Sequence, residues 1–191
     1  EISGQYSYGD LSAGYTELEM FNENVSAANI RIAIENGTNF TLASVKSVGT
    51  YTLVDSSVAG RGLLQAFSVT ELKNVYSAKE MFDANVSAAD VRTNYSVTIL
   101  KNIGTYTLVD SSVPARGLLF ESAFSVAELK DDYSASEMQL ANVSPNDLKG
   151  FYAVTDITSA YGISVLTQEG TSFTLTDFKG QIAISTLKPQ Y

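Results

Sequence analysis

The sequence predicts an all-α chain, a solenoid of short capped helices in repeats of about ten residues. Three observations favour this class: pairs of apolar residues five positions apart, a Ser or Thr after the first of each pair, and a Glu or Asp three residues after that hydroxyl. The clearest copies lie in segment 67–92, where Ser68, Ser77 and Ser87 are the predicted helix caps. The remaining chain is interpreted as further copies of this segment.

The spacing of the motif explains each of its residue types. A Ser at the helix N-cap accepts a hydrogen bond from the third helical N–H, and an acid at that third position bonds back to the cap. The apolar residues then flank the cap as a hydrophobic staple, as Phe67 does with Leu72 and Tyr76 with Met81. Helices this short need tertiary packing to be stable. The acids predicted at the third position are Glu71, Glu80, Asp90, Glu128, Glu137 and Asp147.

The same spacing continues on both sides of this segment. It is interrupted at residues 32–37, IAIENG, whose alternation and Asn-Gly pair are typical of a strand entering a tight hairpin. We interpret these six residues as a local irregularity between repeats. The further pairs are Tyr6–Leu11, Tyr15–Met20, Val25–Ile30, Phe40–Val45, Val86–Val91, Tyr95–Leu100, Phe124–Leu129, Tyr133–Met138, Val143–Leu148, Tyr152–Ile157, Phe173–Phe178 and Ile182–Leu187.

A longer repeat is superimposed on the short one. Two identical GTYTLVDSSV segments begin at Gly49 and Gly104, 55 residues apart. They divide one predicted elongated domain, 1–191, into three long units of about 1–65, 66–122 and 123–191. The last unit diverges after Gly150, as terminal capping repeats do.

Two β architectures are alternatives to the helices. Residues 84–92, ANVSAADVR, resemble the A-[DN]-L-x-x pattern of pentapeptide-repeat proteins, which implies a right-handed β-helix. Runs such as YTLVDSSV suggest instead a β-rich repeat fold. Intervals of four residues, as from Leu72 to Tyr76, would shift the register of a strict five-residue coil, whereas helix–turn units absorb them.

A second resemblance concerns the whole repeat. Segments 67–75 (FSVTELKNV), 76–85 (YSAKEMFDAN) and 124–132 (FSVAELKDD) resemble the tandem [FY]-S-x-x-E-L-K-x-A-G arrays of giant-virus, algal and some bacterial proteins. The chain departs from that pattern where Asn replaces the closing Gly. The resemblance covers most of the chain and brings no catalytic residues with it. It implies an elongated, non-enzymatic protein.

Composition narrows the function classes. A net charge of −9 repels phosphate backbones, so no nucleic-acid partner is expected. With no His and no Cys, the chain lacks the usual general base, thiol nucleophiles and the commonest transition-metal ligands. No apolar run is long enough for a transmembrane segment. We therefore expect no enzyme activity, no cofactor and no metal site.

Two loops that break the spacing rule are the candidate binding sites. Segments 56–64 (SSVAGRGLL) and 111–119 (SSVPARGLL) are near-copies that bring an arginine to matching places, and an aspartate directly precedes each segment. One interpretation is a repeated contact site for a carboxylate, a sulfated glycan or a neighbouring subunit. The other is a structural arginine that covers backbone carbonyls or pairs with the adjacent aspartate. The residues concerned are Arg61, Arg116, Asp55 and Asp110.

Two functions follow as hypotheses. The first is a structural protein that self-associates into a filament, a surface layer or a virion component, with copies of itself or another protein as partners. The second is a binding module that presents the two arginine loops to a protein or glycan partner. Both favour a place on an extracellular surface or a virion, without fixing the compartment.

Overall fold

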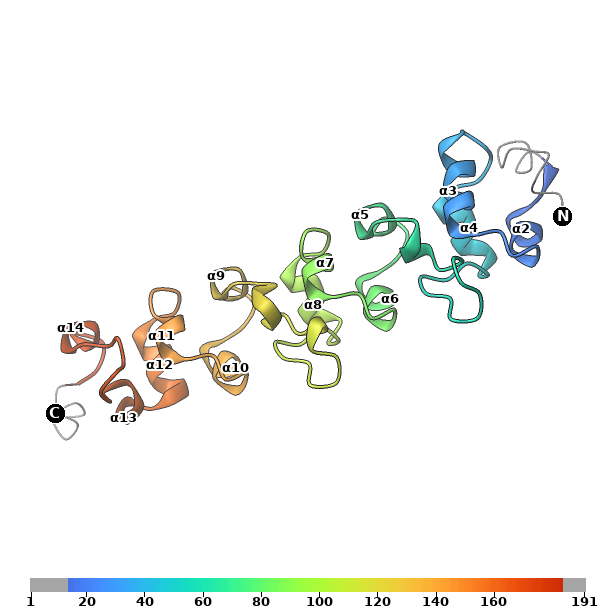
Figure 1. The fold of residues 1–191 in the computed structure, drawn as a ribbon. Coiled ribbons are helices and arrows are strands. Elements are labelled where there is room, and N and C mark those ends of the chain that lie inside the picture. Colours follow the sequence, from blue (N-terminus) through green and yellow to red (C-terminus); the bar gives the residue numbers. More distant parts are fainter. Residues whose placement is uncertain (1–13, 184–191) are drawn as a thin grey trace. The chain divides into compact units, whose positions relative to one another are not determined.

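The computed structural model is helical, which confirms the predicted all-α class (Figure 1). It describes residues 14–183, so the predicted pair Tyr6–Leu11 lies outside the described residues and Ile182–Leu187 lies partly outside them. Within 14–183 no strand forms, and the isolated bridge between Lys149 and Tyr152 is the sole β pairing. Both β alternatives are therefore wrong for this part of the chain.

The described residues form two compact units. The first comprises 14–86 with 93–95, and the second comprises 87–92 with 96–183. The division into three long sequence units stays a prediction. Helices of the first unit are α2 (Glu17–Asn22), α3 (Ala27–Glu35), α4 (Leu42–Val48), the 3₁₀ turn η1 (Leu63–Gln65), α5 (Val69–Leu72) and α6 (Ala78–Asp83).

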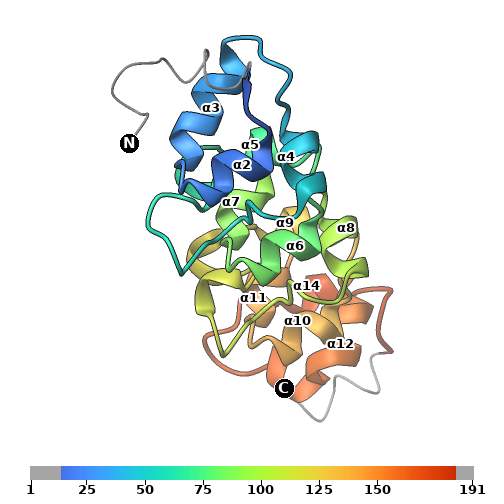
Figure 2. The ribbon, with the colours of Figure 1, turned by 90° about the vertical axis from the view of Figure 1, so that its right-hand side faces the viewer.

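The second unit contains more helices of the same short kind. In it α10 packs against α12, and the two lie side by side in Figure 2. Its elements are α7 (Ala88–Arg92), α8 (Val97–Asn102), η2 (Pro114–Arg116), η3 (Phe120–Ser122), α9 (Val126–Leu129), α10 (Ala135–Leu140), α11 (Pro145–Leu148), α12 (Val154–Tyr161), α13 (Ile163–Leu166) and α14 (Leu175–Phe178).

The predicted capping boxes of Glu71, Glu80, Glu128 and Glu137 are complete, whereas Asp90 and Asp147 accept a hydrogen bond from the hydroxyl of the cap serine. At α5, Ser68 Oγ accepts from Glu71 N at 3.3 Å, and Glu71 Oε2 accepts from Ser68 N at 2.7 Å. These bonds satisfy backbone donors that a helix start otherwise leaves unpaired. The helices with a complete box are capped by Thr16, Thr41, Ser68, Ser77, Ser125, Ser134 and Thr174.

The staple pairs build the core. The second residue of each pair is the fourth helical residue, and it is buried in every described helix for which a pair was predicted. Fully burying a side chain of this size contributes roughly 1.5–3 kcal/mol, which is how four- to nine-residue helices are held. These buried residues are Met20, Ile30, Val45, Leu72, Met81, Val91, Leu100, Leu129, Met138, Leu148, Ile157 and Phe178.

Asparagine replaces glycine at a repeated helix end. Asn24, Asn85 and Asn142 follow the C-caps of α2, α6 and α10 and adopt positive φ of 56°, 58° and 60°. At α6, the N–H of Asn85 bonds to Phe82 O and that of Val86 bonds to Met81 O, the two bonds of a Schellman motif. Asn tolerates this left-handed conformation better than most residues. Asn therefore forms the left-handed turn for which the resembled arrays use their closing Gly.

Residues 32–35 of the segment 32–37 belong to helix α3, residues 36–37 form the turn that ends it, and none of the six is in a strand. Helix α3 starts at its cap Ser26 and continues through Glu35, with Asn36 as its C-cap and Gly37 at φ 73°. Its buried residues Ile30 and Ala33 follow a helical spacing, while Ile32 is exposed. The alternation of apolar and polar residues suggests a strand here, but helix α3 is already capped at Ser26 and packed through Ile30, and it continues into this segment.

Candidate functional site

The first arginine loop forms a closed network in the first unit. Arg61 is 8 % exposed, and its Nε donates to Asp55 Oδ2 at 2.6 Å. Its Nη2 donates to Ser57 Oγ at 3.0 Å and its Nη1 to Asn24 Oδ1 at 3.2 Å. The guanidinium carbon lies 3.9 Å from the centre of the Phe21 ring, a cation–π contact. The arginine thereby joins its own loop to the end of α2.

The second loop repeats this network in the second unit. Arg116 Nε donates to Asp110 Oδ2 at 3.0 Å, and Nη2 donates to Ser112 Oγ at 3.1 Å. Asp110 Oδ1 accepts from the backbone N–H groups of Ser112 and Val113 at 2.8 and 3.0 Å. The aspartate therefore organises the loop as an Asx turn and holds the arginine at the same time.

Close backbone packing shapes both loops. A Cβ at Gly62 would lie 3.0 Å from Asp55 N, and one at Gly117 would lie 3.1 Å from Asp110 N. Neither position has a positive φ, so the glycine is needed for space and not for its dihedral freedom. The next residue in each loop donates across it, Leu63 N to Thr52 O at 3.0 Å in the first.

The electrostatics of the two aspartates follow from this geometry. The pKa of Asp55 is held well below its usual range, first by the Ser57 hydroxyl and then by Arg61. The pKa of Asp110 is lowered to about 2, first by the Ser112 hydroxyl and then by the Val113 N–H. Both aspartates are charged at neutral pH, and each has its arginine as a partner.

The structure thus brings Asp55 to Arg61 and Asp110 to Arg116, each pair inside one unit. This is the pairing that the structural interpretation of the loops expects. Binding of a carboxylate, a glycan or a subunit at these four residues stays a prediction. A ligand for the Arg61 guanidinium would compete with three internal hydrogen bonds.

A second recurring arrangement, which we call the cation clamp, links helices far apart in sequence. Lys46, the fifth residue of α4, donates to Val75 O at 2.7 Å and pairs with Glu80 Oε1 at 2.7 Å. Its Nζ lies 4.4 Å from the centre of the Tyr76 ring. One cation therefore contacts the aromatic before a cap, the carbonyl before that aromatic, and the acid of the capping box.

The contacts to the ring and to the acid recur five times among the described residues. In each copy the cation directly follows the buried fourth residue of one helix, and it contacts the aromatic residue and the acid at the cap of a later helix. The aromatic residue lies 24 to 36 positions after the cation in the sequence. The cation–aromatic–acid sets are Arg31–Phe67–Glu71, Lys46–Tyr76–Glu80, Arg92–Phe124–Glu128, Lys101–Tyr133–Glu137 and Lys149–Phe173–Asp177.

The sequence interpretation missed the clamp cations. It assigned the acids to helix capping alone, and Glu80 Oε2 does bond to Ser77. The second oxygen, Oε1, is the one that meets Lys46. A basic residue directly after the apolar fourth helical residue is the signal in the sequence, and all five clamp-donating helices have it. The same signal follows α5, α9 and α14, for which no clamp forms among the described residues, so it does not identify a clamp by itself.

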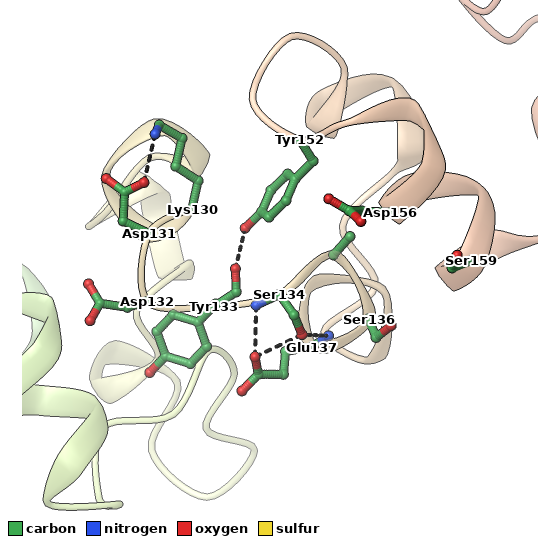
Figure 3. A pocket seen from close by; sticks show the side chains of 11 residues that line it. Lys130, Asp131, Asp132, Tyr133, Ser134, Ser136, Glu137, Tyr152, Asp156 and Ser159 are labelled. Carbon is green, nitrogen blue, oxygen red and sulfur yellow. Dashed lines mark hydrogen bonds and ion pairs between the residues drawn. The ribbon is translucent and has the colours of Figure 1, made fainter. Parts of the chain in front are cut away.

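A cavity of about 530 Å³ lies in the second unit (Figure 3). Tyr152 donates from its hydroxyl to Tyr133 O at 2.7 Å beside this cavity, and burial raises its pKa to about 12. Lys130 is paired with Asp131 at 2.7 Å. The carboxylates that line it are Asp131, Asp132, Glu137 and Asp156. Among the described residues no group of acids is arranged to hold a metal ion.

Two equivalent grooves of about 390 Å³ lie beside the clamps, one in each unit. The first has Tyr51, Leu53 and Val54 along one side and the second has Tyr106, Leu108 and Val109. They differ at their far sides, where the first has Asp83 and the second has Leu140. Val54 and Val109 are both exposed, so each groove has an apolar edge open to solvent.

No protein-family model matches this chain, and comparisons with curated proteins and with solved structures find no match. Across residues 14–183, none of the helices combines the length and the apolar character that crossing a membrane requires.

Proposed function

We propose that the chain is a non-enzymatic structural protein, a solenoid of short helices that self-associates into a filament, a surface layer or a virion component. The observation that supports this most is the cation clamp. The same ring and acid contacts join one helix of the chain to the cap of another in five described copies. Recognition of one repeat by another is therefore a recurring polar interaction within the chain, and self-association would extend the same kind of contact to a repeat of another copy.

The repeated construction of the chain agrees with this function. Repeat proteins bury each unit against its neighbours, so a surface that is complementary to a repeat is also complementary to the same repeat of another copy. Contacts of that head-to-tail kind continue into open assemblies when the rotation between copies does not close a ring. The acidic net charge of −9 would keep the unassembled chain soluble.

Size-exclusion chromatography with light scattering, over a hundredfold range of protein concentration, tests the proposal. We expect mass to rise with concentration, and negative-stain images at the highest concentration to show fibres or sheets. A monodisperse monomer throughout that range would contradict self-association.

A binding module that presents the two arginine loops to a protein or glycan partner is the second candidate, supported by the two equivalent grooves whose edges, Val54 and Val109, directly precede Asp55 and Asp110. Replacing Arg61 would also break the loop, so Val54→Asp with Val109→Asp is the cleaner test. Both valines are exposed and pack little. This double variant should lose capture of the partner while its helical circular dichroism is unchanged, and unaltered capture would contradict binding at the grooves.

A further inference from the structure

The two grooves beside the clamps are near-copies that differ at one place. Each groove is lined by ten residues, and nine of these positions hold the same residue type in both grooves. The tenth position is Asp83 in the first groove and Leu140 in the second, and both side chains are exposed. The chain therefore holds two versions of one groove that differ by a single charge.

A non-helical backbone segment forms one wall of each groove. Along residues 51–54 of the first groove, buried and exposed side chains alternate. The carbonyls of Thr52 and Leu53 accept hydrogen bonds from the arginine loop at 3.0 and 3.1 Å, whereas the N–H groups of Thr52, Leu53 and Val54 donate to no acceptor within residues 14–183. Residues 106–109 repeat this arrangement in the second groove. Unpaired backbone donors beside an apolar groove suit a peptide, because its carbonyls accept hydrogen bonds from them.

The first groove also contains a buried hydroxyl group without a partner. Tyr76 lines this groove and is 6 % exposed, and its hydroxyl has no hydrogen bond within the described residues. Buried polar groups of native proteins are nearly always hydrogen-bonded. A polar group of a molecule bound in the groove can supply the bond that Tyr76 lacks.

Asp83 determines which charge the first groove attracts. The other two charged residues that line it, Lys46 and Glu80, already neutralise each other at 2.7 Å. Asp83 pairs with Lys79 at 2.8 Å, but both side chains are more than half exposed, and an exposed pair of this kind contributes little. The Asp83 carboxylate is therefore open to a basic side chain from outside, whereas Leu140 offers no charge at the same place.

We propose that the first groove binds a peptide segment of a partner protein that presents an apolar side chain next to a lysine or arginine. The apolar side chain packs against Val54, the peptide carbonyls accept from the unpaired N–H groups, and the cation pairs with Asp83. The second groove provides the first two interactions without the third, so it discriminates little between basic and acidic segments. This inference rests on the second candidate function, the binding module, and gives the chemistry of its partner.

Peptide binding to chains with one weakened groove tests this preference. Val109→Asn removes the apolar edge of the second groove without adding a charge, and Val54→Asn does the same to the first. The probes are two fluorescein-labelled hexapeptides of alternating Thr and Val that differ at one position, Lys in one and Glu in the other. In the Val109→Asn chain, fluorescence anisotropy should show the Lys peptide binding at least about fivefold more tightly than the Glu peptide. In the Val54→Asn chain the two affinities should agree within about twofold.

Exchange of the one differing residue provides the matched control. Asp83→Leu in the Val109→Asn chain should reduce the preference to within about twofold, and Leu140→Asp in the Val54→Asn chain should raise it to at least about fivefold. Asp131→Asn removes an exposed acid that lines neither groove, so it should change neither preference. Circular dichroism of each variant checks that its helices are intact.

The outcomes separate this proposal from the function on which it rests. Equal affinity of the two peptides for the first groove would overturn the charge preference and leave the binding function standing. Failure of both peptides to bind either groove would contradict the binding function for peptide partners. Affinity for the Lys peptide that falls as protein concentration rises would show that a second copy occupies the groove, which would overturn a separate peptide partner.

Discussion

Helices α2 and α6 have almost the same local sequence and lie in the same unit, yet their surroundings differ. The segment YTELEMFNENVS begins at Tyr15 and YSAKEMFDANVS begins at Tyr76, and both form complete capping boxes. Tyr76 is nevertheless buried beneath Lys46, while Tyr15 is exposed. The local motif therefore builds the start of each helix, and the two helices differ in that a cation from a distant helix covers the aromatic residue of α6.

The largest expected effect concerns the attachment that α2 does have. Arg61→Ala removes three hydrogen bonds and the stacking on Phe21, and it leaves the charge of Asp55 without its partner. Losing charge-assisted bonds of a buried arginine costs about 2–3 kcal/mol. Urea denaturation should show this loss. An Arg61→Ala variant as stable as the wild type would show that the network does not hold α2.

Removing the clamp from α6 should make it resemble α2. Lys46→Met keeps the packing of the alkyl chain and loses the contacts to Glu80, Val75 and the Tyr76 ring. Because the Lys46 side chain is 33 % exposed, we expect a loss of roughly 1–2 kcal/mol. Hydrogen exchange at the start of α6 should rise at the same time.

The control for this variant is Lys73→Met. Lys73 has the equivalent position after α5 but forms no ion pair within the described residues, so its loss should cost less than about 0.5 kcal/mol. Equal losses in both variants would mean that the clamp contributes nothing specific.

The turn after each helix should respond independently of the clamp. Asn142 has φ 60°, so Asn142→Ala should cost about 1 kcal/mol, because a Cβ without a local hydrogen-bonding group strains this conformation. Asn142→Gly should be within about 0.5 kcal/mol of the wild type. Thermal unfolding measures the stability of both variants. A glycine variant that is much less stable than the wild type would contradict this account, because the Asn142 side chain would then stabilise the protein by a contact of its own.

Low pH should lower the stability of the capped helices, and this is the smallest of the expected effects. The Ser68 hydroxyl, the Ser68 N–H and Arg31 hold the pKa of Glu71 below its ordinary 4.5. A carboxyl with a lowered folded-state pKa contributes stability that is present above pH 4.5 and is lost as pH falls through the folded-state pKa. Stability titrated from about pH 6 to about pH 3 should therefore fall below about pH 4.5, and Glu71→Gln should flatten that slope.

The sequence predicts well whatever depends on a few neighbouring residues. Ser68 and Glu71 are three positions apart, so their pairing follows from helix geometry, and the burial of Leu72 follows from the staple. The clamps cannot be predicted in this way, because Lys46 and Tyr76 are 30 residues apart. Their meeting depends on how helices pack, which local spacing does not encode.

The candidate loops show the same division. The matching positions of Arg61 and Arg116 are evident from the repeated segments, and pairing with Asp55 and Asp110 is one of the two interpretations that the sequence allows. The contact of Arg61 with Phe21 on α2 does not follow from the sequence, because it spans 40 residues. The strand-like alternation of residues 32–37 does not produce a strand for a related reason, since alternation over six residues says little once a capped helix runs into them.

A double-mutant cycle on Lys46 and Glu80 tests the clamp most directly. Lys46→Met, Glu80→Gln and the double variant are compared by urea denaturation, with Lys46→Met and Glu71→Gln as the control cycle in the same unit. We predict a coupling of at least about 0.5 kcal/mol for the Lys46–Glu80 cycle and additive effects in the control. Additivity in both cycles would contradict the clamp, because the distant cation would then not be what distinguishes α6 from α2.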